Sequence, residues 1–400
     1  MSKRYIFLKI KHILITTKTS SMVKILNPGI ERMSWERFWV SLTQDLQIEI
    51  LIRLPVKSLM RFKCIQRSWN ILFKSPSFVN KKRLYNSEYD KGHSLMILHK
   101  YEYSYITLLY CDYHKNRTTT TTTTPTNTLF PDKGTIFKIK SYGSCNGVFL
   151  LEAFYWDTIV THLILWNPTT KEVHVIPDPP SCCDSKFDDS LYGFCAFNND
   201  NNFKVVRLQL CFDENSVIYP SLAEVYNLCT KSWTRSEHPP PATPITRQSQ
   251  PRYTPVVNYV YHWITTSDPF SVSNILCYDF RKNQFHQLKA PREVYRCARE
   301  NIAEIKGSLA YILEYHQFYP TELEIWVMDQ GKWAKKYNIG LIETCMRGLS
   351  KNGDQVFGGG GKLLRCYDHQ GNLIRQFEVS MNYGCSLFLR EYVQSIIPLS

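Results

Sequence analysis

Two glycine-rich stretches are the first places in this 400-residue sequence to look for catalytic chemistry. The run Gly143–Gly147 has the G-x-C-x-G spacing of a nucleophile elbow, which needs a strand before it and a helix after it. The residues that follow, 148–151, are strand-like, so we interpret the run as a tight turn whose glycines supply unusual backbone angles. Gly358–Gly361 before Lys362 is similar to a phosphate loop, but the first glycine and the magnesium-binding Ser or Thr are missing. We interpret this second run as a flexible turn between strands.

Metal chemistry is also disfavoured. The eleven histidines, including His162, His174 and His262, have no metal-ligand spacing, and the thirteen cysteines form no C-x-x-C pair. A zinc-binding RING of its own is therefore excluded. We interpret His262, which precedes Trp263, as a packed core residue. The sequence predicts no cofactor, no metal site and no enzyme activity.

Charge and cysteine usage bear on location and partners. The formal net charge is +13, but outside the first ninety residues the basic residues are diffuse, and no nucleic-acid-binding signature is found. With an odd cysteine count and no secretory signal, we expect reduced thiols in the cytoplasm or the nucleus, with no membrane and no nucleic-acid partner. Residues 1–40 form a basic extension that we expect to be disordered. The alternatives are an organelle transit peptide and a true start at Met33.

The segment 42–75 has the apolar spacing of three short helices in close succession. Ser41 and Gln44 fit a capping box at the start of the first helix. Pro55 ends that helix, because proline lacks an N–H and crowds the preceding turn, and Pro76 ends the set. The apolar residues with helical spacing are Leu46, Ile50, Leu51, Leu54, Leu59, Phe62, Ile65, Trp69, Leu72 and Phe73.

The polar face of these helices is basic, with only Asp45 and Glu49 opposing it. So short a helical segment cannot bury this many large apolar side chains by itself. We therefore expect a partner surface that is apolar at its centre and acidic at its rim. The basic residues are Lys57, Arg61, Lys63, Arg67 and Lys74.

Three stretches of the segment, LPVKSL (54–59), RFKCI (61–65) and SW (68–69), resemble an F-box in order and spacing. The residues 55–65 are most similar to S-locus F-box and related plant F-box proteins, while Thr43 and Gln66 depart from the pattern. The resemblance implies docking on the Skp adaptor of a cullin-RING ubiquitin ligase. The residues expected to bind the adaptor are Leu42, Leu46, Ile50, Leu54, Pro55, Val56, Leu59, Ile65 and Trp69.

From about Tyr101 the pattern changes to short strands and turns, with a weak internal repeat. The core of each copy is a strand ending in an aromatic, then Asn or Asp, then a polar turn, and then a second strand. This is typical of a β-hairpin, since Asn or Asp bonds its own backbone in the turn and the aromatic closes the pair across the strands. The copies are Leu163–Val173, Glu224–Trp233, Ile275–Phe285, Ile325–Trp333 and Leu364–Ile374, with Leu109–Asp112 as a degenerate sixth.

The repeat recurs every ~40 to 60 residues, which is the period of propeller blades. Further strand signals at 146–150, 261–264 and 306–311 are interpreted as the inner strands of the blades. We therefore predict a kelch-like β-propeller of about six blades, with a pair of β-sandwiches as the alternative. The low-complexity stretch 116–132, with its unbroken threonine run 118–124, is expected to be a mobile loop.

This second region resembles the F-box-associated domain of plant F-box proteins, in CNG (145–147), WNPTT (166–170), HW (262–263) and IWVM (325–328). The expected fold is an N-terminal three-helix F-box at 41–84 followed by the propeller at 93–400. The implied function is substrate recognition in an SCF-type ubiquitin ligase. The implied partners are a Skp-type adaptor, a cullin bound through that adaptor, and a protein target.

In the S-locus group, which acts in self-incompatibility, the target is a secreted style ribonuclease. The alternative is a free-standing propeller enzyme or glycan-binding protein with an incidental helical cap. Two loops, 177–189 and 239–254, are candidates for target recognition.

Overall fold

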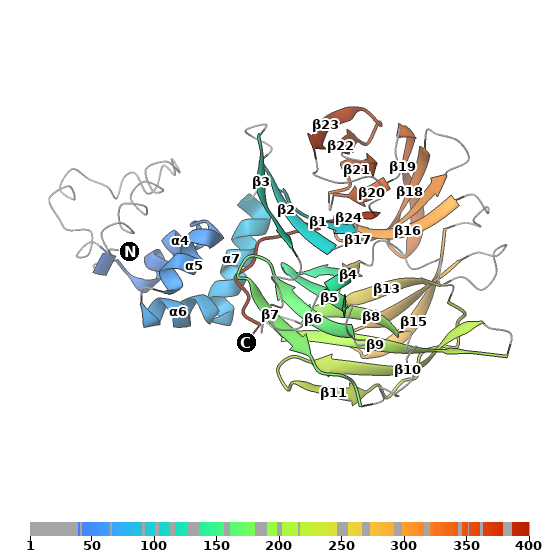
Figure 1. Ribbon diagram of the computed structural model, residues 1–400, viewed down its shortest axis with the longest axis horizontal. Helices are drawn as coiled ribbons and strands as arrows, with labels where there is room; N and C mark the ends of the chain where they lie inside the picture. Colours follow the sequence, from blue (N-terminus) through green and yellow to red (C-terminus); the bar gives the residue numbers. More distant parts are fainter. Residues whose placement is uncertain are drawn as a thin grey trace. The chain divides into compact units, whose positions relative to one another are not determined.

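The computed structural model describes residues 39–40, 42–64, 66–89, 93–100, 104–112, 117–125, 136–155, 161–180, 190–197, 202–214, 217–245, 255–265, 273–291, 298–315, 321–342, 346–350, 352–360, 363–378 and 386–399 (Figure 1). The chain divides into two compact units. The helical unit combines residues 1–91 with 167–172 and 393–400, and the strand unit comprises 92–166 and 173–392.

Four helices are described in the helical unit where the sequence predicted three: α4 (Gln44–Ile52), α5 (Val56–Lys63), α6 (Arg67–Lys74) and α7 (Pro76–Tyr89). The N-cap of α4 is Thr43, whose hydroxyl accepts from the Leu46 N–H at 3.4 Å, rather than Ser41, which lies outside the described residues. Pro76 does not end the set. It is the first residue of α7, a position where a missing N–H costs nothing because no helical partner exists for it.

The described strands of the second unit form six four-stranded antiparallel sheets. Five of them use consecutive strands: β4 (Ile136–Cys145), β5 (Val148–Tyr155), β6 (Thr161–Asn167), β7 (Glu172–Ile176); β8 (Ser190–Phe197), β9 (Asn202–Phe212), β10 (Ile218–Asn227), β11 (Ser232–Arg235); β12 (Val256–Val257), β13 (Val260–Thr265), β14 (Asn274–Asp279), β15 (Gln284–Lys289); β16 (Ala298–Ile305), β17 (Ser308–Tyr315), β18 (Thr321–Asp329), β19 (Lys332–Ile342); and β20 (Met346–Leu349), β21 (Gln355–Gly360), β22 (Leu363–Asp368), β23 (Leu373–Glu378). The sixth sheet has the order β24 (Ser386–Tyr392), β1 (His93–Lys100), β2 (Ser104–Asp112), β3 (Arg117–Pro125).

The sixth sheet joins the two ends of the strand unit, since β24 pairs with β1 from Ser94 opposite Tyr392 to Lys100 opposite Ser386. The separate four-stranded sheets do not fit the alternative of two sandwiches, and the prediction of a β-propeller is confirmed. The segments expected to be inner strands fall in β5, β13 and β17, each of which is second in its sheet, not at its edge.

The predicted repeat forms the last hairpin of each consecutive sheet. In the turn after β10, Asn227 Oδ1 accepts from the Cys229 N–H at 2.9 Å, and after β14 Asp279 Oδ1 accepts from the Arg281 N–H at 2.8 Å. The aromatics after these turns lie across from the strand before them, with Tyr226 and Trp233 ring centroids 5.4 Å apart. Local side-chain chemistry thus sets the hairpin register, as the repeat predicted.

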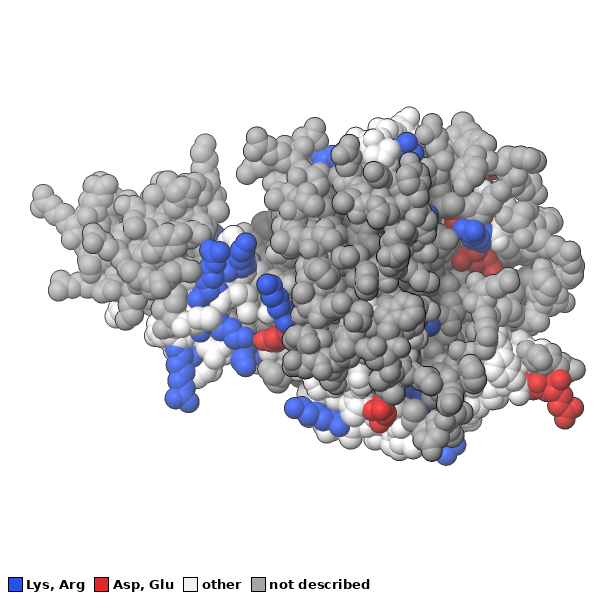
Figure 2. Space-filling model, in the orientation of Figure 1, with Lys and Arg blue, Asp and Glu red and all other residues white. Residues whose placement is uncertain are grey.

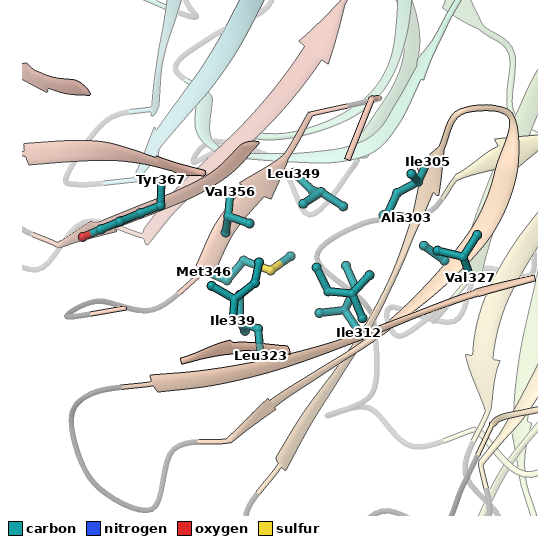
Figure 3. Packing of buried hydrophobic residues seen from close by; sticks show 12 residues of the cluster. Ala303, Ile305, Ile312, Leu323, Val327, Ile339, Met346, Leu349, Val356 and Tyr367 are labelled. Carbon is teal, nitrogen blue, oxygen red and sulfur yellow. The ribbon is translucent and has the colours of Figure 1, made fainter. Parts of the chain in front are cut away.

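The core of the strand unit lies between neighbouring sheets. Figure 3 shows Ile312, Leu323 and Ile339 of β16–β19 packed against Met346, Val356 and Tyr367 of β20–β22. A second cluster joins β12–β15 to β16–β19 in the same way, with Ile275 and Tyr311 both 0 % exposed. The sheet β16–β19 therefore packs against a neighbouring sheet on each of its two faces, which explains why its middle strand β17 is a near-continuous apolar run.

Two sequence interpretations are wrong in this unit. The threonine run is not a loop but most of β3, which pairs with β2 at the edge of its sheet. Threonine has high β-propensity, and pairing on one side satisfies its backbone without requiring a buried side chain. The glycine run 358–360 is not a turn, because it belongs to β21 and pairs with β22.

Candidate functional site

The helical unit is closed around a line of aromatic side chains. Trp69 of α6 lies 5.9 Å from Trp39 and 5.5 Å from Phe62 of α5, measured between ring centroids. Phe73 continues the line to Phe78 of α7 at 5.0 Å. Such contacts add ~0.5–1.5 kcal/mol per pair to the burial of the rings. The helices α5, α6 and α7 therefore share one aromatic core.

A buried lysine completes the end of α4. Lys82 of α7 donates from Nζ to the carbonyl oxygens of Ile52 at 2.7 Å and Leu54 at 2.8 Å. Lys82 is 3 % exposed. Carbonyls at a helix C-terminus have no partner within the helix, and a cation there also interacts favourably with the helix dipole. The lysine thus fixes α7 against the corner at Pro55.

The nine residues expected to bind an adaptor fall into three groups. Leu42 and Leu46 are half-buried and Pro55 is exposed. Ile65 lies outside the described residues. The remaining five are buried within the helical unit: Ile50, Leu54, Val56, Leu59 and Trp69. In this state they can act on an adaptor only indirectly, by supporting the exposed surface of the helices.

The surface that the helices do present is basic with an apolar residue in it. Ile71 of α6 is 62 % exposed, because the neighbouring Trp69 and Phe73 use the opposite side of the helix for the core. Lys57 and Arg61 of α5 are exposed, as are three basic or polar residues of α6, Arg67, Ser68 and Lys74. Figure 2 shows Lys and Arg side chains gathered where α4 to α6 lie in Figure 1, with little acid among them. We call Pro55, Lys57, Arg61, Arg67, Ile71 and Lys74 the basic helical face.

Among the residues that the structure describes, no ion pair involves a member of the basic helical face. The acid nearest in sequence, Glu49 of α4, pairs at 3.6 Å with Arg53, the C-cap residue of the same helix. Lys63 at the end of α5 is different, since its Nζ lies 3.3 Å from Glu172. The arrangement fits a partner with acidic groups around an apolar centre, which is what the amphipathic sequence predicted.

The strand unit offers no catalytic constellation among the described residues. The G-x-C-x-G run is a strand–turn–strand, with Asn146 and Gly147 at φ 50° and 82° between β4 and β5, so no helix follows the cysteine. No group of His, Cys, Asp or Glu in the described part of the chain could hold a metal ion. Of the two candidate recognition loops, 177–180 and 239–245 are described, and the rest lie outside the described residues.

The buried polar groups of the strand unit are structural. His262 is 4 % exposed, with Nδ1 3.3 Å from the carbonyl of Pro255, and burial lowers its pKa to about 4. It is a neutral, packed core residue, as the sequence indicated. The Tyr142 hydroxyl donates to Glu152 at 2.6 Å, and burial together with this carboxylate raises its pKa well above the ordinary value. No helix in the described chain reaches the length and apolar character of a membrane span.

Sequence reasoning missed three features of the helical unit. The exposure of Ile71 could have been found, because it sits between two core positions four residues apart. The buried position of Lys82 has a weaker signal, its place on the same face of α7 as Phe78 and Val79. Residues 167–172 and 393–399, which belong to this unit, carry no signal that links them to the helices.

Comparisons with known proteins agree with the description of the strand unit. The family model described as F-box associated beta propeller domain matches residues 93–352. F-box only protein 8 of Arabidopsis thaliana is 26% identical over 272 residues, covering 64% of this chain and 82% of that protein. An Arabidopsis thaliana F-box/kelch-repeat protein is 26% identical over 323 residues, 77% of this chain and 82% of its own length. Among solved structures, the crystal structure of TolB from Acinetobacter baumannii is 12% identical, with a TM-score of 0.43, over 75% of this chain and 66% of that one.

Proposed function

This chain is a plant F-box protein that belongs to the F-box associated β-propeller family, and on that premise we propose that it is the substrate-recognition subunit of an SCF-type cullin-RING ubiquitin ligase. In this role the helical unit docks on a Skp-type adaptor, which links it to a cullin. The propeller binds a protein target. The chain contributes no reacting group, because its work is to raise the effective concentration of the target near the charged ubiquitin-conjugating enzyme.

The observation that carries the proposal is the basic helical face. An exposed Ile71 with Arg67 and Lys74 one turn away on the same helix is the pattern of a protein-binding surface, since an apolar contact at the centre supplies affinity and charges at the rim supply orientation and speed. Besides this face, which includes Pro55, the adaptor is expected to contact Leu42 and Leu46. The buried Ile50, Leu54, Val56, Leu59 and Trp69 act by keeping this face in shape, and Ile65 remains an expected contact.

The resemblance of residues 55–65 to S-locus F-box proteins supports a narrower proposal, in which the target is a secreted style ribonuclease captured in pollen. Such ribonucleases are basic, and the formal net charge of +13 opposes their approach. Affinity for such a target should therefore rise as salt screens the repulsion. If no such ribonuclease binds at any salt concentration tested, this target is wrong, while the proposed adaptor role is unaffected. The proposed place of action is the cytoplasm or the nucleus, the reducing compartments expected from the cysteine usage.

The adaptor role is tested with the full-length chain and a purified Skp-type adaptor in a direct binding measurement. We expect a complex that also captures a cullin when one is added. A well-folded chain that binds no adaptor would contradict the proposal, and it would favour the alternative of a free-standing propeller enzyme or glycan-binding protein.

A further inference from the structure

Residues 393–399 form a buried segment without secondary structure. Ser395, Ile396, Ile397 and Leu399 are each between 2 and 6 % exposed, and the segment groups with the helices in the helical unit. Buried backbone N–H and C=O groups must be paired, and here neither a helix nor a sheet pairs them. Side chains have to do so instead.

Those side chains come from two places far away in the sequence. Asn86 of α7 donates from Nδ2 to the Gln394 carbonyl at 3.0 Å. Asn167 donates from Nδ2 to the carbonyls of Ser395 at 3.2 Å and Ile397 at 2.9 Å. Asn86 and Asn167 are 5 and 0 % exposed. Each side-chain amide supplies the hydrogen-bond donor that a neighbouring strand would supply to these carbonyls in a sheet.

The amide of Asn167 serves two structures at once. Its Oδ1 accepts from the N–H groups of Thr169 at 2.9 Å and Thr170 at 3.3 Å, which builds the repeat turn, while its Nδ2 holds the segment. The same repeat position is filled by Asp279 and Asp368 in later sheets, and an aspartate carboxylate has no N–H to donate. Asn227 has the amide but is half-buried, and its Oδ1 builds its own turn.

Glu172, at the other end of the same turn, joins the segment to α5. Its Oε2 accepts from the Leu399 N–H at 2.9 Å, and its Oε1 lies 3.3 Å from Lys63 Nζ. Thr169 adds its hydroxyl as an acceptor for the Ser395 N–H at 3.4 Å. The turn 167–172 therefore pairs both the donors and the acceptors of the segment, and through Glu172 it reaches a helix.

We propose that residues 393–399 are a latch that completes the helical unit, so that α4–α7 reach their packed state only in a chain that has been made through Leu399. The helices come early in the sequence, and their last structural member follows β24 directly. A chain that stops short of the latch would carry an incomplete helical unit. Under the proposed function, such a chain would be a poor adaptor ligand, which would keep incomplete receptors out of the ligase.

The test compares two single substitutions in the full-length chain by hydrogen exchange with mass spectrometry. Asn167→Asp keeps the Oδ1 acceptor of the turn but sets a carboxylate against the carbonyls of Ser395 and Ile397. Asn227→Asp makes the same chemical change at the same repeat position, where no latch is held. We expect Asn167→Asp to speed exchange about tenfold or more in peptides covering 393–399, and measurably in α5 and α7, while Asn227→Asp leaves them unchanged.

A second variant keeps the proposal falsifiable if Asn167→Asp fails to fold. A chain ended after Tyr392 retains all of β24, so its strand unit should keep wild-type exchange while α5 and α7 lose protection. Unchanged helix exchange in either variant would overturn the latch. Adaptor binding by the wild-type chain is measured in parallel. Its absence would count against the proposed function alone, since the exchange result stands without it.

Discussion

The Nζ of Lys82 lies 2.7 Å from the carbonyl oxygen of Ile52, which makes a buried cation on α7 the C-terminal partner of α4. Lys82→Met keeps most of the side-chain volume but leaves this carbonyl and that of Leu54 without their donor. We expect the helical unit to lose about 2 kcal/mol, since hydrogen bonds to charged groups are worth ~1.5–3 kcal/mol. The loss of stability is measured as faster hydrogen exchange in peptides that cover α4.

Lys81→Met is the matched control for this prediction, because the neighbouring Lys81 is exposed. It should change stability by less than about 0.5 kcal/mol. Equal effects of the two substitutions would show that loss of positive charge, and not loss of the α4 cap, is what matters.

Ile71→Asp should weaken adaptor binding by about tenfold or more, because it puts a charge at the apolar centre of the basic helical face. The side chain is 62 % exposed, so the fold should tolerate the change. Leu373→Asp in β23, at a site 53 % exposed, is the control and should bind as the wild type does. Equilibrium binding to a purified Skp-type adaptor gives both values, and indifference to Ile71→Asp would remove this face from the proposed interface.

Arg61→Glu tests the rim of the same face. Charges at a rim act mainly on the association rate, so we expect slower association and a weaker dependence on salt, with a smaller change in dissociation. Stopped-flow association at two ionic strengths separates these quantities. A pure increase in the dissociation rate would mean that Arg61 is buried in the complex, contrary to its assignment as a rim residue.

Gly193→Ala should destabilise the strand unit by about 1–3 kcal/mol, the usual cost of overpacking. A Cβ at Gly193 would lie 2.7 Å from Cδ1 of Tyr261 and 2.9 Å from Cζ2 of Trp263, and both rings are buried. Gly340→Ala in β19 is the control, since nothing lies within 4 Å of its Cβ position. Urea unfolding should give a lower midpoint with an unchanged slope for Gly193→Ala only.

Acid should destabilise the strand unit partly through His262. Its folded-state pKa of about 4 lies below the ordinary 6.5, so the unfolded chain takes up this proton first as the pH falls. The stability contributed at neutral pH is lost between about pH 6.5 and 4, and amounts to roughly 3 kcal/mol in full. His262→Gln should flatten the pH dependence of the unfolding free energy in this window. An unchanged pH profile would mean that other groups dominate acid unfolding.

Much of the fold could be predicted because its determinants are local. Asn227 and Asp279 set their turns with their own side chains, and Trp233 lies opposite Tyr226 only a few residues away. Such hairpins are encoded within about a dozen residues each. The helices were found for the same reason, since Leu59 and Phe62 of α5, and Trp69 and Phe73 of α6, repeat at helical spacing.

The candidate site was harder, because an apolar residue in a helix can face the core or a partner. Leu54 and Leu59 were expected to contact an adaptor and are buried, while Ile71 was not singled out and is exposed. The latch had no local signal at all, since Asn167 and Ser395 are more than two hundred residues apart and the segment between Val393 and Leu399 has no period. Only the assembled chain brings those groups together.

The threonine run in β3 has one more consequence. In an ordinary strand, a one-residue slip exchanges every side chain between the two faces. In a run of identical residues, a slipped strand presents the same side chains as before. A gain or loss of one threonine therefore leaves threonine paired opposite the same residues of β2. The ladder already passes over one residue here, where Thr107 pairs with Thr123 and Leu108 with Thr121. This outer strand can therefore accommodate a change in the length of the threonine tract by moving a bulge along itself.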